Sequence, residues 1–569
     1  MNQAALYHSG MYPEIYAPDR FHLMFSFRTA SEDVKTCTLI YFHKNHREET
    51  TKEEQMSVQY HLGISDVYTA SVSFQKPARY LQYYFRVTGK TGETFWYNAW
   101  GTVEQCPESG FFEYAYANDS TVGQMPPKWS QGTVYYQIFP ERFRKGDPSH
   151  APENCMVWGS KPTPSNFMGG DLVGIRKSLG YLAELGIECI YLNPIFWSPS
   201  NHKYDTTDYY RVDPHFGTKE DLRMLIREAH EKKIKVIFDA VFNHTGTEFF
   251  AFADLLKKQE KSEYRNWYHI TRFPVKADAD CYECFFGFAG MPKLNTGNQE
   301  VQEYLLKVLE YWVREVQVDG YRYDVIDEVD EKFVLKIRDR LKRLNSELVL
   351  IGETWAEGKR LLNGCGMDSI MNYSFRQAML DFFAERSIDA ETLGYRLETA
   401  LSRHPSETNA AMFNALDTHD TERFINSCGH RMESFKLGVV VQMMFPGSPS
   451  IYYGDEAGMD GENDPDCRKC MMWEENPGEK ESFHFYQKLI QLRKNHSAIR
   501  AGSFATILAE GRVYGFARRK EEEIIEVFVN DGDGTAEIAV ENQRSISLPP
   551  GKFYVICWKK GEVTEEVCG

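Results

Sequence analysis

The sequence lacks several features that define whole classes of protein. Its first residues show no basic segment followed by an apolar one, so we expect no secretory signal. No stretch approaches the roughly 20 consecutive apolar residues that span a bilayer. Cysteine is sparse, with 12 in 569 residues. That density is too low for a disulfide scaffold, and it predicts reduced thiols in a cytoplasmic protein.

An excess of positive charge is also missing. The chain has 65 Lys and Arg against 82 Asp and Glu, a formal net charge of −17. Binding of nucleic acid requires clustered basic side chains, and the sequence shows no such cluster. We therefore expect neither nucleic acid nor a membrane among the partners.

Aromatic residues, by contrast, are abundant. They make up 14% of the chain, as 37 Phe, 33 Tyr and 10 Trp. Aromatic rings fill cores, and they also form flat platforms on which sugar rings stack. Composition alone does not choose between these two uses.

Two Cys-x-x-Cys pairs have the spacing of metal ligands, Cys281 with Cys284 and Cys467 with Cys470. A four-cysteine zinc site would require these distant pairs to meet in space. Neither pair lies in a zinc-ribbon context, so plain thiols on loops are the favoured interpretation and a zinc site is the alternative.

The chain divides into three regions of different pattern. Residues 1–122 alternate short aromatic or β-branched runs with polar turns, which predicts an N-terminal β-sandwich. Residues 123–499 hold apolar runs separated by amphipathic segments, after a linker that contains Pro126 and Pro127. In residues 500–569 the strand pattern returns and predicts a small C-terminal β domain.

The central region predicts an α/β fold, a closed (β/α)8 TIM barrel. Near-continuous apolar runs alternating with helical segments are typical of a parallel sheet covered by helices, and their number favours closure. The runs span residues 134–139, 187–194, 234–242, 318–325, 348–351, 369–373, 411–416 and 449–453, and the clearest helical segments span 221–232, 301–316 and 332–344. The loop after the third run, residues 245–297, is unusually long. Such barrel loops usually carry function, and we treat this one as a separate domain B.

Polar clusters follow several of these runs. The third run leads into Asp239 and His244, the fourth contains Arg322 and Asp324, the fifth precedes Glu353, and the seventh leads into His419 and Asp420. In a barrel these positions share one rim, where active sites lie. Several buried carboxylates interleaved with His and Arg are costly as mere packing, so the pattern indicates a functional site.

Two of these carboxylates suit different chemical roles. Arg322 and Asp324 are two residues apart on one strand, so they share a face, and the guanidinium favours an ionised, nucleophilic Asp324. Glu353, near Trp355, is expected to keep its proton as a general acid. Such a pair cleaves glycosidic bonds. The alternative for Asp324 is a salt bridge with Arg322 that only braces the strand.

These blocks resemble the α-amylase family, glycoside hydrolase family 13, over essentially the whole chain. The segment Met291-Pro292-Lys293-Leu294-Asn295 narrows the resemblance to the group of neopullulanases, cyclomaltodextrinases and maltogenic amylases. Further matching segments span residues 136–143, 201–206 and 463–470. The resemblance implies a retaining hydrolase that cleaves α-1,4-glucosidic bonds of cyclodextrins and maltooligosaccharides, with pullulan and glycosyl transfer as further activities. It also implies an N-terminal domain of the starch-binding-module type.

The resemblance assigns a role to each site residue. Asp324 is the implied nucleophile, Glu353 the acid/base and Asp420 the transition-state stabiliser. A retaining mechanism predicts about 5–5.5 Å between the carboxyl groups of Asp324 and Glu353. The implied sugar-contacting residues are His244, Arg322, His419, Asp464, Arg468, Tyr204 and Asp239. We also expect Tyr204, Phe286, Trp355 and Phe242 to line the sugar cleft.

The resemblance further implies a homodimer, in which the N-terminal domain of one chain covers the site of the other, and no required cofactor. Several relatives bind Ca²⁺ after the first barrel strand. Here a degenerate version remains, with Asp147, Gly169 and Asp171, whereas Lys145 replaces an oxygen donor. Ca²⁺ needs six to eight oxygens, so we expect none to be bound. Our hypothesis is that the Lys145 amine takes the place of the ion and pairs with both aspartates.

Two alternatives remain at this stage. An exo-acting α-glucosidase or a glucanotransferase would use the same three acids. A catalytically inactive carbohydrate-binding or transporter-associated relative would belong to a different class, but such proteins typically lose the acids. The presence of Asp324, Glu353 and Asp420 favours the enzyme.

Overall fold

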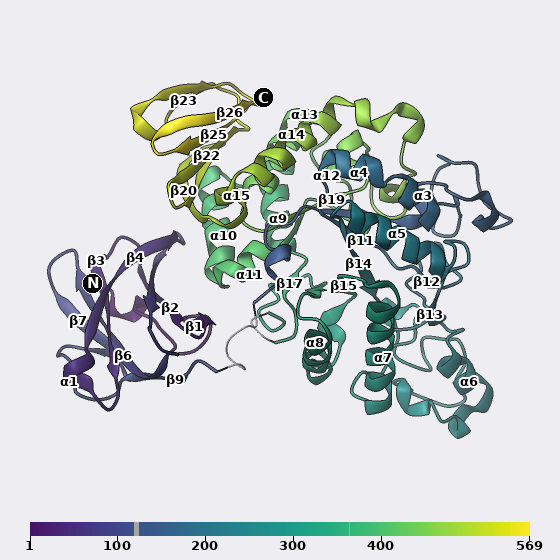
Figure 1. The fold of residues 1–569 in the computed structure, drawn as a ribbon, viewed down its shortest axis with the longest axis horizontal. Coiled ribbons are helices and arrows are strands. Elements are labelled where there is room, and N and C mark those ends of the chain that lie inside the picture. Colours follow the sequence, from purple (N-terminus) through teal and green to yellow (C-terminus); the bar gives the residue numbers. More distant parts are fainter. Residues whose placement is uncertain (119–124, 363–364) are drawn as a thin grey trace.

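The computed structural model describes residues 1–118, 125–362 and 365–569 (Figure 1). An N-terminal β domain and a C-terminal β domain lie on one side of a central helix-covered barrel. The expected boundary at residues 122 and 123 falls outside the described residues. Within the described ranges, no helix has both the length and the apolar character needed to cross a membrane.

The central sheet is a closed barrel of parallel strands. Its eight strands follow the order β17-β16-β15-β14-β11-β10-β19-β18, and a parallel bridge between Met371 and Phe413 joins the two end strands. The strands are β10 (Tyr135–Ile138), β11 (Cys189–Leu192), β14 (Lys235–Ala240), β15 (Gly320–Tyr323), β16 (Val349–Gly352), β17 (Ser369–Ile370), β18 (Phe413–Ala415) and β19 (Ser448–Tyr452). Each lies in one of the predicted apolar runs or overlaps it, so the TIM barrel is confirmed.

Alternation along the strands fills the barrel interior and builds the site above it. The interior core includes Tyr135, Cys189, Tyr191, Ile237, Val349, Ile351, Phe413 and Ala415. Two residues after Ile237 comes Asp239, and two residues after Ile351 comes Glu353. Because side chains alternate between faces, these carboxylates continue the interior face. Asp239 also lies directly beside Arg322 in the register of β14 and β15.

Helices cover the barrel as the amphipathic segments predict. They include α5 (Lys219–Glu231), α7 (Gln299–Val316) and α8 (Glu331–Leu344). Thr218 and Asp221 form a capping box that starts α5 by satisfying its first backbone N–H groups. The other helices are α1 (Arg47–Thr50), α2 (Pro140–Phe143), α3 (Leu172–Lys177), α4 (Leu179–Leu185), α6 (Phe250–Lys258), α9 (Tyr373–Met379), α10 (Ala390–Ser402), α11 (Ser406–Ala411), α12 (Phe424–Ser427), α13 (Met432–Met444), α14 (Glu481–Asn495) and α15 (Ser497–Ala501).

The long third loop is largely irregular. Apart from α6 it holds only short helical turns, and bridges such as His244 with Lys293 tie it to the end of the third barrel strand. A two-stranded ribbon, β12 (Phe196–Trp197) and β13 (Asp208–Val212), follows the second barrel strand.

The N-terminal domain is a nine-stranded antiparallel sheet folded around its own core. Its strands are β1 (Ile15–Asp19), β2 (His22–Ala30), β3 (Val34–His43), β4 (Lys52–His61), β5 (Ser65–Ser73), β6 (Arg79–Gly89), β7 (Thr94–Asn98), β8 (Gly101–Val103) and β9 (Phe112–Tyr116). The C-terminal domain has a five-stranded antiparallel sheet and a two-stranded one. Its strands are β20 (Ser503–Glu510), β21 (Val513–Lys520), β22 (Glu523–Asn530), β23 (Ala536–Ala539), β24 (Ser545–Leu548), β25 (Phe553–Lys559) and β26 (Glu562–Cys568).

One buried carboxylate connects all three parts of the molecule. Glu398 of α10 is 2% exposed and accepts hydrogen bonds from the backbone N–H of His61 in β4 and of Thr506 in β20, the latter at 3.0 Å. Helix α10 lies between the two β domains in Figure 1. The two carboxylate oxygens therefore hold strands of two separate domains against the barrel.

The variant Glu398→Gln tests this connection. An amide keeps one acceptor oxygen and places an NH₂ group against the other backbone N–H, so we expect a loss of about 1–3 kcal/mol of stability. The melting temperature should fall, and the amides of His61 and Thr506 should exchange with deuterium faster. The exposed Glu385→Gln serves as the control. Unchanged exchange at both amides in Glu398→Gln would contradict the connection.

Candidate active site

A single buried guanidinium gathers three of the predicted carboxylates. Arg322 is 1% exposed, and its Nη1 donates to both oxygens of Asp239 at 2.9 and 3.0 Å and to Oδ1 of Asp324 at 2.9 Å. Its Nη2 forms an ion pair with Oε2 of Glu353 at 2.8 Å. Arg322 therefore does more than brace one strand, because it links the ends of β14, β15 and β16.

Asp324 has one engaged oxygen and one available oxygen. Oδ2 is buried and accepts no hydrogen bond from the described residues. Burial raises the pKa of Asp324 well above its usual range, as does the charge of Glu353, whereas Arg322 acts in the opposite direction. Oδ2 is therefore the oxygen of Asp324 that is free to attack a substrate.

Backbone strain next to Asp324 positions Glu353. Val325 has φ 43° and ψ 47°, a left-handed conformation that is unfavourable for a β-branched residue. In this conformation the Val325 N–H donates to Oε2 of Glu353 at 2.9 Å. The strain thus directs a fixed donor at the acid/base.

Trp355 stacks on Tyr373 with ring centroids 4.0 Å apart.

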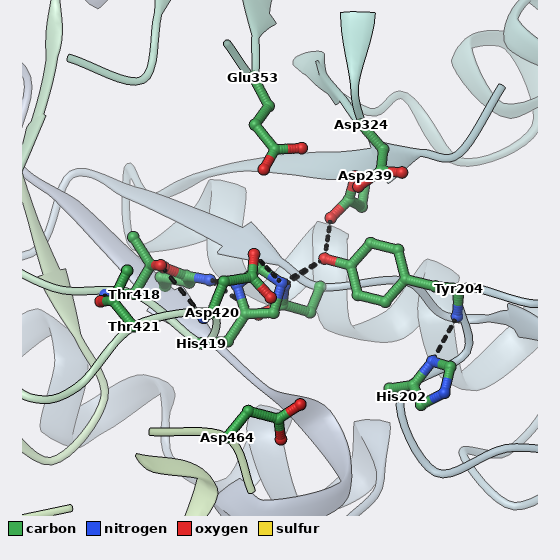
Figure 2. A network of polar contacts seen from close by, with 12 residues as sticks. His202, Tyr204, Asp239, Asp324, Glu353, Thr418, His419, Asp420, Thr421 and Asp464 are labelled. Atoms are coloured by element: carbon green, nitrogen blue, oxygen red, sulfur yellow. Dashed lines mark hydrogen bonds and ion pairs between the residues drawn. The ribbon is translucent and has the colours of Figure 1, made fainter. Parts of the chain in front are cut away.

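A hydrogen-bond chain orients His419 and Tyr204 (Figure 2). Burial lowers the pKa of His419 well below its usual value, so the ring is neutral. Gln137 Nε2 donates to Nδ1 of His419 at 2.7 Å, which places the remaining proton on Nε2. Nε2 lies 2.5 Å from the Tyr204 hydroxyl, which donates to Oδ2 of Asp239 at 2.9 Å. These hydrogen bonds define a single tautomer for His419.

Three members of this network were not predicted as site residues. Gln137 is the last residue but one of β10, and its Nε2 also donates to Oδ1 of Asn193 at 3.0 Å. Asn193 donates to the Tyr204 hydroxyl at 3.0 Å, and Tyr191 donates to Asp239 at 2.7 Å. Gln137 and Asn193 are polar residues at the ends of the first two apolar runs, which is the same signal that identified the later strands.

His244 has a free ring nitrogen at the site. It is buried, stacks on Phe285 with centroids 4.9 Å apart, and burial lowers its pKa to about 3. Its Nε2 has no hydrogen-bond partner in the described part of the chain. A neutral imidazole with an unused nitrogen can bind a sugar hydroxyl. The MPKLN segment lies beside it, since Lys293 Nζ donates to Oδ1 of Asn243 at 2.9 Å.

Arg468 joins the seventh and eighth strand loops. Its Nη1 pairs with Asp464 at 3.0 Å, its Nη2 pairs with Asp420 at 3.2 Å, and its Nε donates to the carbonyl of His419 at 2.8 Å. The Asp420 side chain is 31% exposed, whereas that of Asp324 is 7% exposed. Asp420 therefore faces the open side of the site, opposite the buried pair.

Arg423 supports this pair of loops from beneath, although the sequence analysis did not identify it. The guanidinium is buried and donates to Oδ1 of Asp455 at 2.7 Å, to the Tyr453 carbonyl at 2.9 Å and to the Cys467 carbonyl at 3.2 Å. The backbone just before Arg468 is therefore held in place. Cys467 itself is a buried thiol.

All twelve cysteines are free thiols. Across residues 1–118, 125–362 and 365–569, no group of three or more His, Cys, Asp or Glu side chains is arranged to hold a metal ion.

The four aromatic candidates for the sugar cleft differ in exposure. Phe286 is 83% exposed and Trp355 is 59% exposed, and Tyr204 contributes its hydroxyl to the network above. The expectation for Phe242 is wrong. It is 1% exposed and packs against Tyr209 and Tyr323, with ring centroids 5.8 and 6.2 Å away.

The expected pairing of Lys145 is also wrong. Asp171 accepts from the backbone N–H of Gly174 at 2.6 Å, as the N-cap of α3, and from that of Asp147 at 2.7 Å. Asp147 accepts from Ser149. With these oxygens engaged, Lys145 forms no ion pair with either aspartate, all three being described residues. Its ammonium instead lies 5.9 Å from the ring centroid of Trp158.

Comparison with known proteins matches two family models to the chain. The model for the α-amylase catalytic domain covers residues 137–478, and the model for the α-amylase N-terminal Ig-like domain covers residues 1–118.

Whole-chain relatives agree with these models. A cyclomaltodextrinase of Thermoanaerobacter pseudethanolicus (strain ATCC 33223 / 39E) is 42% identical, over 98% of this chain and 100% of the relative. Neopullulanase 2 of Thermoactinomyces vulgaris is 41% identical, over 85% and 82%. A solved cyclomaltodextrinase structure superposes with a TM-score of 0.91 at 36% identity, over 96% of this chain and 98% of that one. The chain therefore belongs to the α-amylase family of glycoside hydrolases, within its cyclomaltodextrinase and neopullulanase type.

Proposed function

We propose that the protein is a retaining hydrolase of α-1,4-glucosidic bonds in cyclodextrins and maltooligosaccharides, with pullulan as a further substrate and glycosyl transfer as a side reaction. The observation that carries the proposal is the pair of Asp324 and Glu353 on one buried guanidinium. The similarity to cyclomaltodextrinases and neopullulanases supports the substrate class.

The arrangement supports a double displacement. Oδ2 of Asp324 attacks the anomeric carbon while Glu353 gives its proton to the glycosidic oxygen, so the C–O bond breaks and a glycosyl ester forms on Asp324. Glu353, now ionised, then takes a proton from water, whose oxygen attacks the same carbon and releases Asp324. Transfer occurs when a sugar hydroxyl takes the place of water.

The remaining residues hold the sugar and its developing charge. Asp420 lies on the open side, where its carboxylate can stabilise a positively charged ring carbon, and Arg468 fixes its position. The free Nε2 of His244 and the oriented Tyr204 are suited to bind hydroxyls of the ring being cleaved. Each of these groups is neutral or satisfied before substrate binds, so little reorganisation is required.

The alternative functions use the same acids. An exo-acting α-glucosidase would release glucose from chain ends only, and a glucanotransferase would produce mainly longer chains. An inactive carbohydrate-binding relative is disfavoured by the buried carboxylate pair, because keeping these like charges together is costly without a catalytic use.

Substitution of the catalytic pair tests the proposal. In Asp324→Asn and Glu353→Gln we expect kcat to fall at least about a thousandfold on β-cyclodextrin, maltoheptaose and pullulan, because the nucleophile or the proton donor is lost. The new reducing ends from wild-type protein should be α-anomers, as measured by NMR within the first turnovers. The exposed Asp327→Asn is the control, with activity close to wild type. Release of β-anomers would exclude double displacement.

We also propose a homodimer formed through the N-terminal domain, in a cytoplasmic protein. The twelve free thiols fit a reducing compartment. The N-terminal domain exposes large apolar side chains that a partner could cover, namely Met11 (70% exposed), Ile64 (90%) and Trp100 (74%).

Removal of residues 1–122 tests the dimer. We expect sedimentation velocity to show a dimer for the full chain and a monomer for the truncated one. Activity on soluble starch relative to β-cyclodextrin should rise severalfold, because the partner domain no longer covers the site. A monomeric full-length protein, or an unchanged substrate ratio, would argue against this arrangement.

We propose that activity needs no metal ion, although Asp147, Gly169 and Asp171 retain part of a calcium site. Hydrogen-bond donors engage both carboxylate oxygens of Asp171 and Oδ1 of Asp147, which leaves few oxygens for an ion that needs six to eight. Dialysis against EDTA should leave both cyclodextrin hydrolysis and the melting temperature unchanged. A fall of about 2 °C or more, reversed by added Ca²⁺, would reveal a stabilising ion.

A further inference from the structure

A groove of about 810 Å³ lies between the loop after the first barrel strand and the loop after the eighth. Trp158 and Pro162 line one side, and Asp460, Asp466, Lys469 and Trp473 line the other. In the described residues, none of these six side chains forms a hydrogen bond or ion pair with Asp324, Glu353 or Asp420. The mechanism above therefore leaves the groove unused.

Two tryptophans are held rigidly in this groove. The indole N–H of Trp158 donates to the carbonyl of Met471 at 3.1 Å, and that of Trp473 donates to the carbonyl of Phe143. Arg144 lies over the ring of Trp473, with its guanidinium carbon 4.7 Å from the ring centroid. Because both N–H groups are already bonded to backbone, the rings contribute flat apolar surface rather than free donors. Rigid aromatic surfaces of this kind are suited to stack against the apolar face of a sugar ring.

The polar groups of the groove are arranged for hydroxyls rather than for ions. Lys469 Nζ pairs with Asp460 at 2.9 Å and with Asp466 at 3.1 Å, which places a donor between two acceptors. The lining also contains Lys161, Glu474 and Glu475, so four acidic and two basic side chains give a formal charge of −4 + 2 = −2. The lining thus holds no cluster of basic groups such as phosphates and nucleic acid require, and the nearby cations Lys145 and Arg144 lie over the rings of Trp158 and Trp473. A neutral ligand with many hydroxyls and flat faces fits both features.

The groove and the catalytic site share the eighth loop as a wall. Arg468 pairs with both Asp464 and Asp420, whereas Asp466 and Lys469 line the groove. From these contacts we infer that the groove between Trp158 and Lys469 is a second carbohydrate-binding site, which holds a stretch of α-glucan outside the catalytic pocket. This inference rests on the proposed function, since it assumes that the substrate is a glucan.

Kinetics on a short and a long substrate test the site. p-Nitrophenyl α-maltoside has two glucose units and maltoheptaose has seven, so we expect only the longer substrate to extend from the catalytic pocket into the groove. In Trp158→Ala we expect KM for maltoheptaose to rise about tenfold, the effect of one lost stacking contact of about 1.4 kcal/mol. The kcat for maltoheptaose, and both KM and kcat for p-nitrophenyl α-maltoside, should not change. Asp460→Ala should raise KM for maltoheptaose about threefold. It is the second test variant, to be used if Trp158→Ala does not fold.

Trp129→Ala is the matched control. Its indole N–H also donates to a backbone carbonyl, that of Glu347 at 2.8 Å, and Lys235 lies 4.8 Å from its ring centroid, but it precedes the first barrel strand. It should leave both substrates unaffected. The inference is overturned if the groove variants leave the KM for maltoheptaose unchanged or impair both substrates equally. It is also overturned if the groove variants weaken binding of an oligolysine peptide but leave the KM for maltoheptaose unchanged, because the groove would then bind a cationic peptide and not a glucan. Failure of the proposed function looks different, because the wild-type protein would then hydrolyse neither substrate.

Discussion

The site depends on one buried positive charge placed among three carboxylates. With Asp239, Asp324 and Glu353 all ionised, the group around Arg322 would carry +1 − 3 = −2, with no solvent to screen it. Burial and the neighbouring charge of Glu353 accordingly raise the pKa of Asp324. Arg322 acts in the opposite direction and so limits the cost of keeping Asp324 ionised for nucleophilic attack. Without Arg322, the same residues would repel one another.

Arg322 can hold these groups only because the barrel sets their spacing. The parallel register places Asp239 beside it, and the two-residue period of a strand places Asp324 on the same face. Glu353 comes from the next strand, and the strained Val325 provides its backbone donor. Strain of this kind persists where the surrounding structure fixes the chain, and here the closed sheet and the carboxylate of Glu353 do so. Fold and site are thus not separable at this rim.

Much of this could be predicted from the sequence, for a definite reason. The eight barrel strands are apolar on both faces, so their runs are distinct, and the polar residues that end them mark one rim. The prediction failed where it depended on which face of a strand a side chain occupies, or on which groups compete for the same hydrogen-bond acceptor. Phe238, Ala240 and Phe242 alternate with Asp239 and so face the helix layer, which removes Phe242 from the cleft. The predicted pairing of Lys145 failed because backbone N–H groups already donate to both carboxylate oxygens of Asp171. No sequence pattern reveals such backbone donors.

The eighth loop shows how one short segment can serve two surfaces. Asp464, Asp466, Arg468 and Lys469 lie within six residues, yet their ion pairs divide between Asp420 on one side and Asp460 on the other. Arg423 makes this division possible, because it anchors the Cys467 carbonyl between them from below. Asp420 is partly exposed and pairs with Arg468 of this loop, so its position depends on the loop. A ligand that contacts the outer face of the loop would therefore act on the same backbone that positions Asp420.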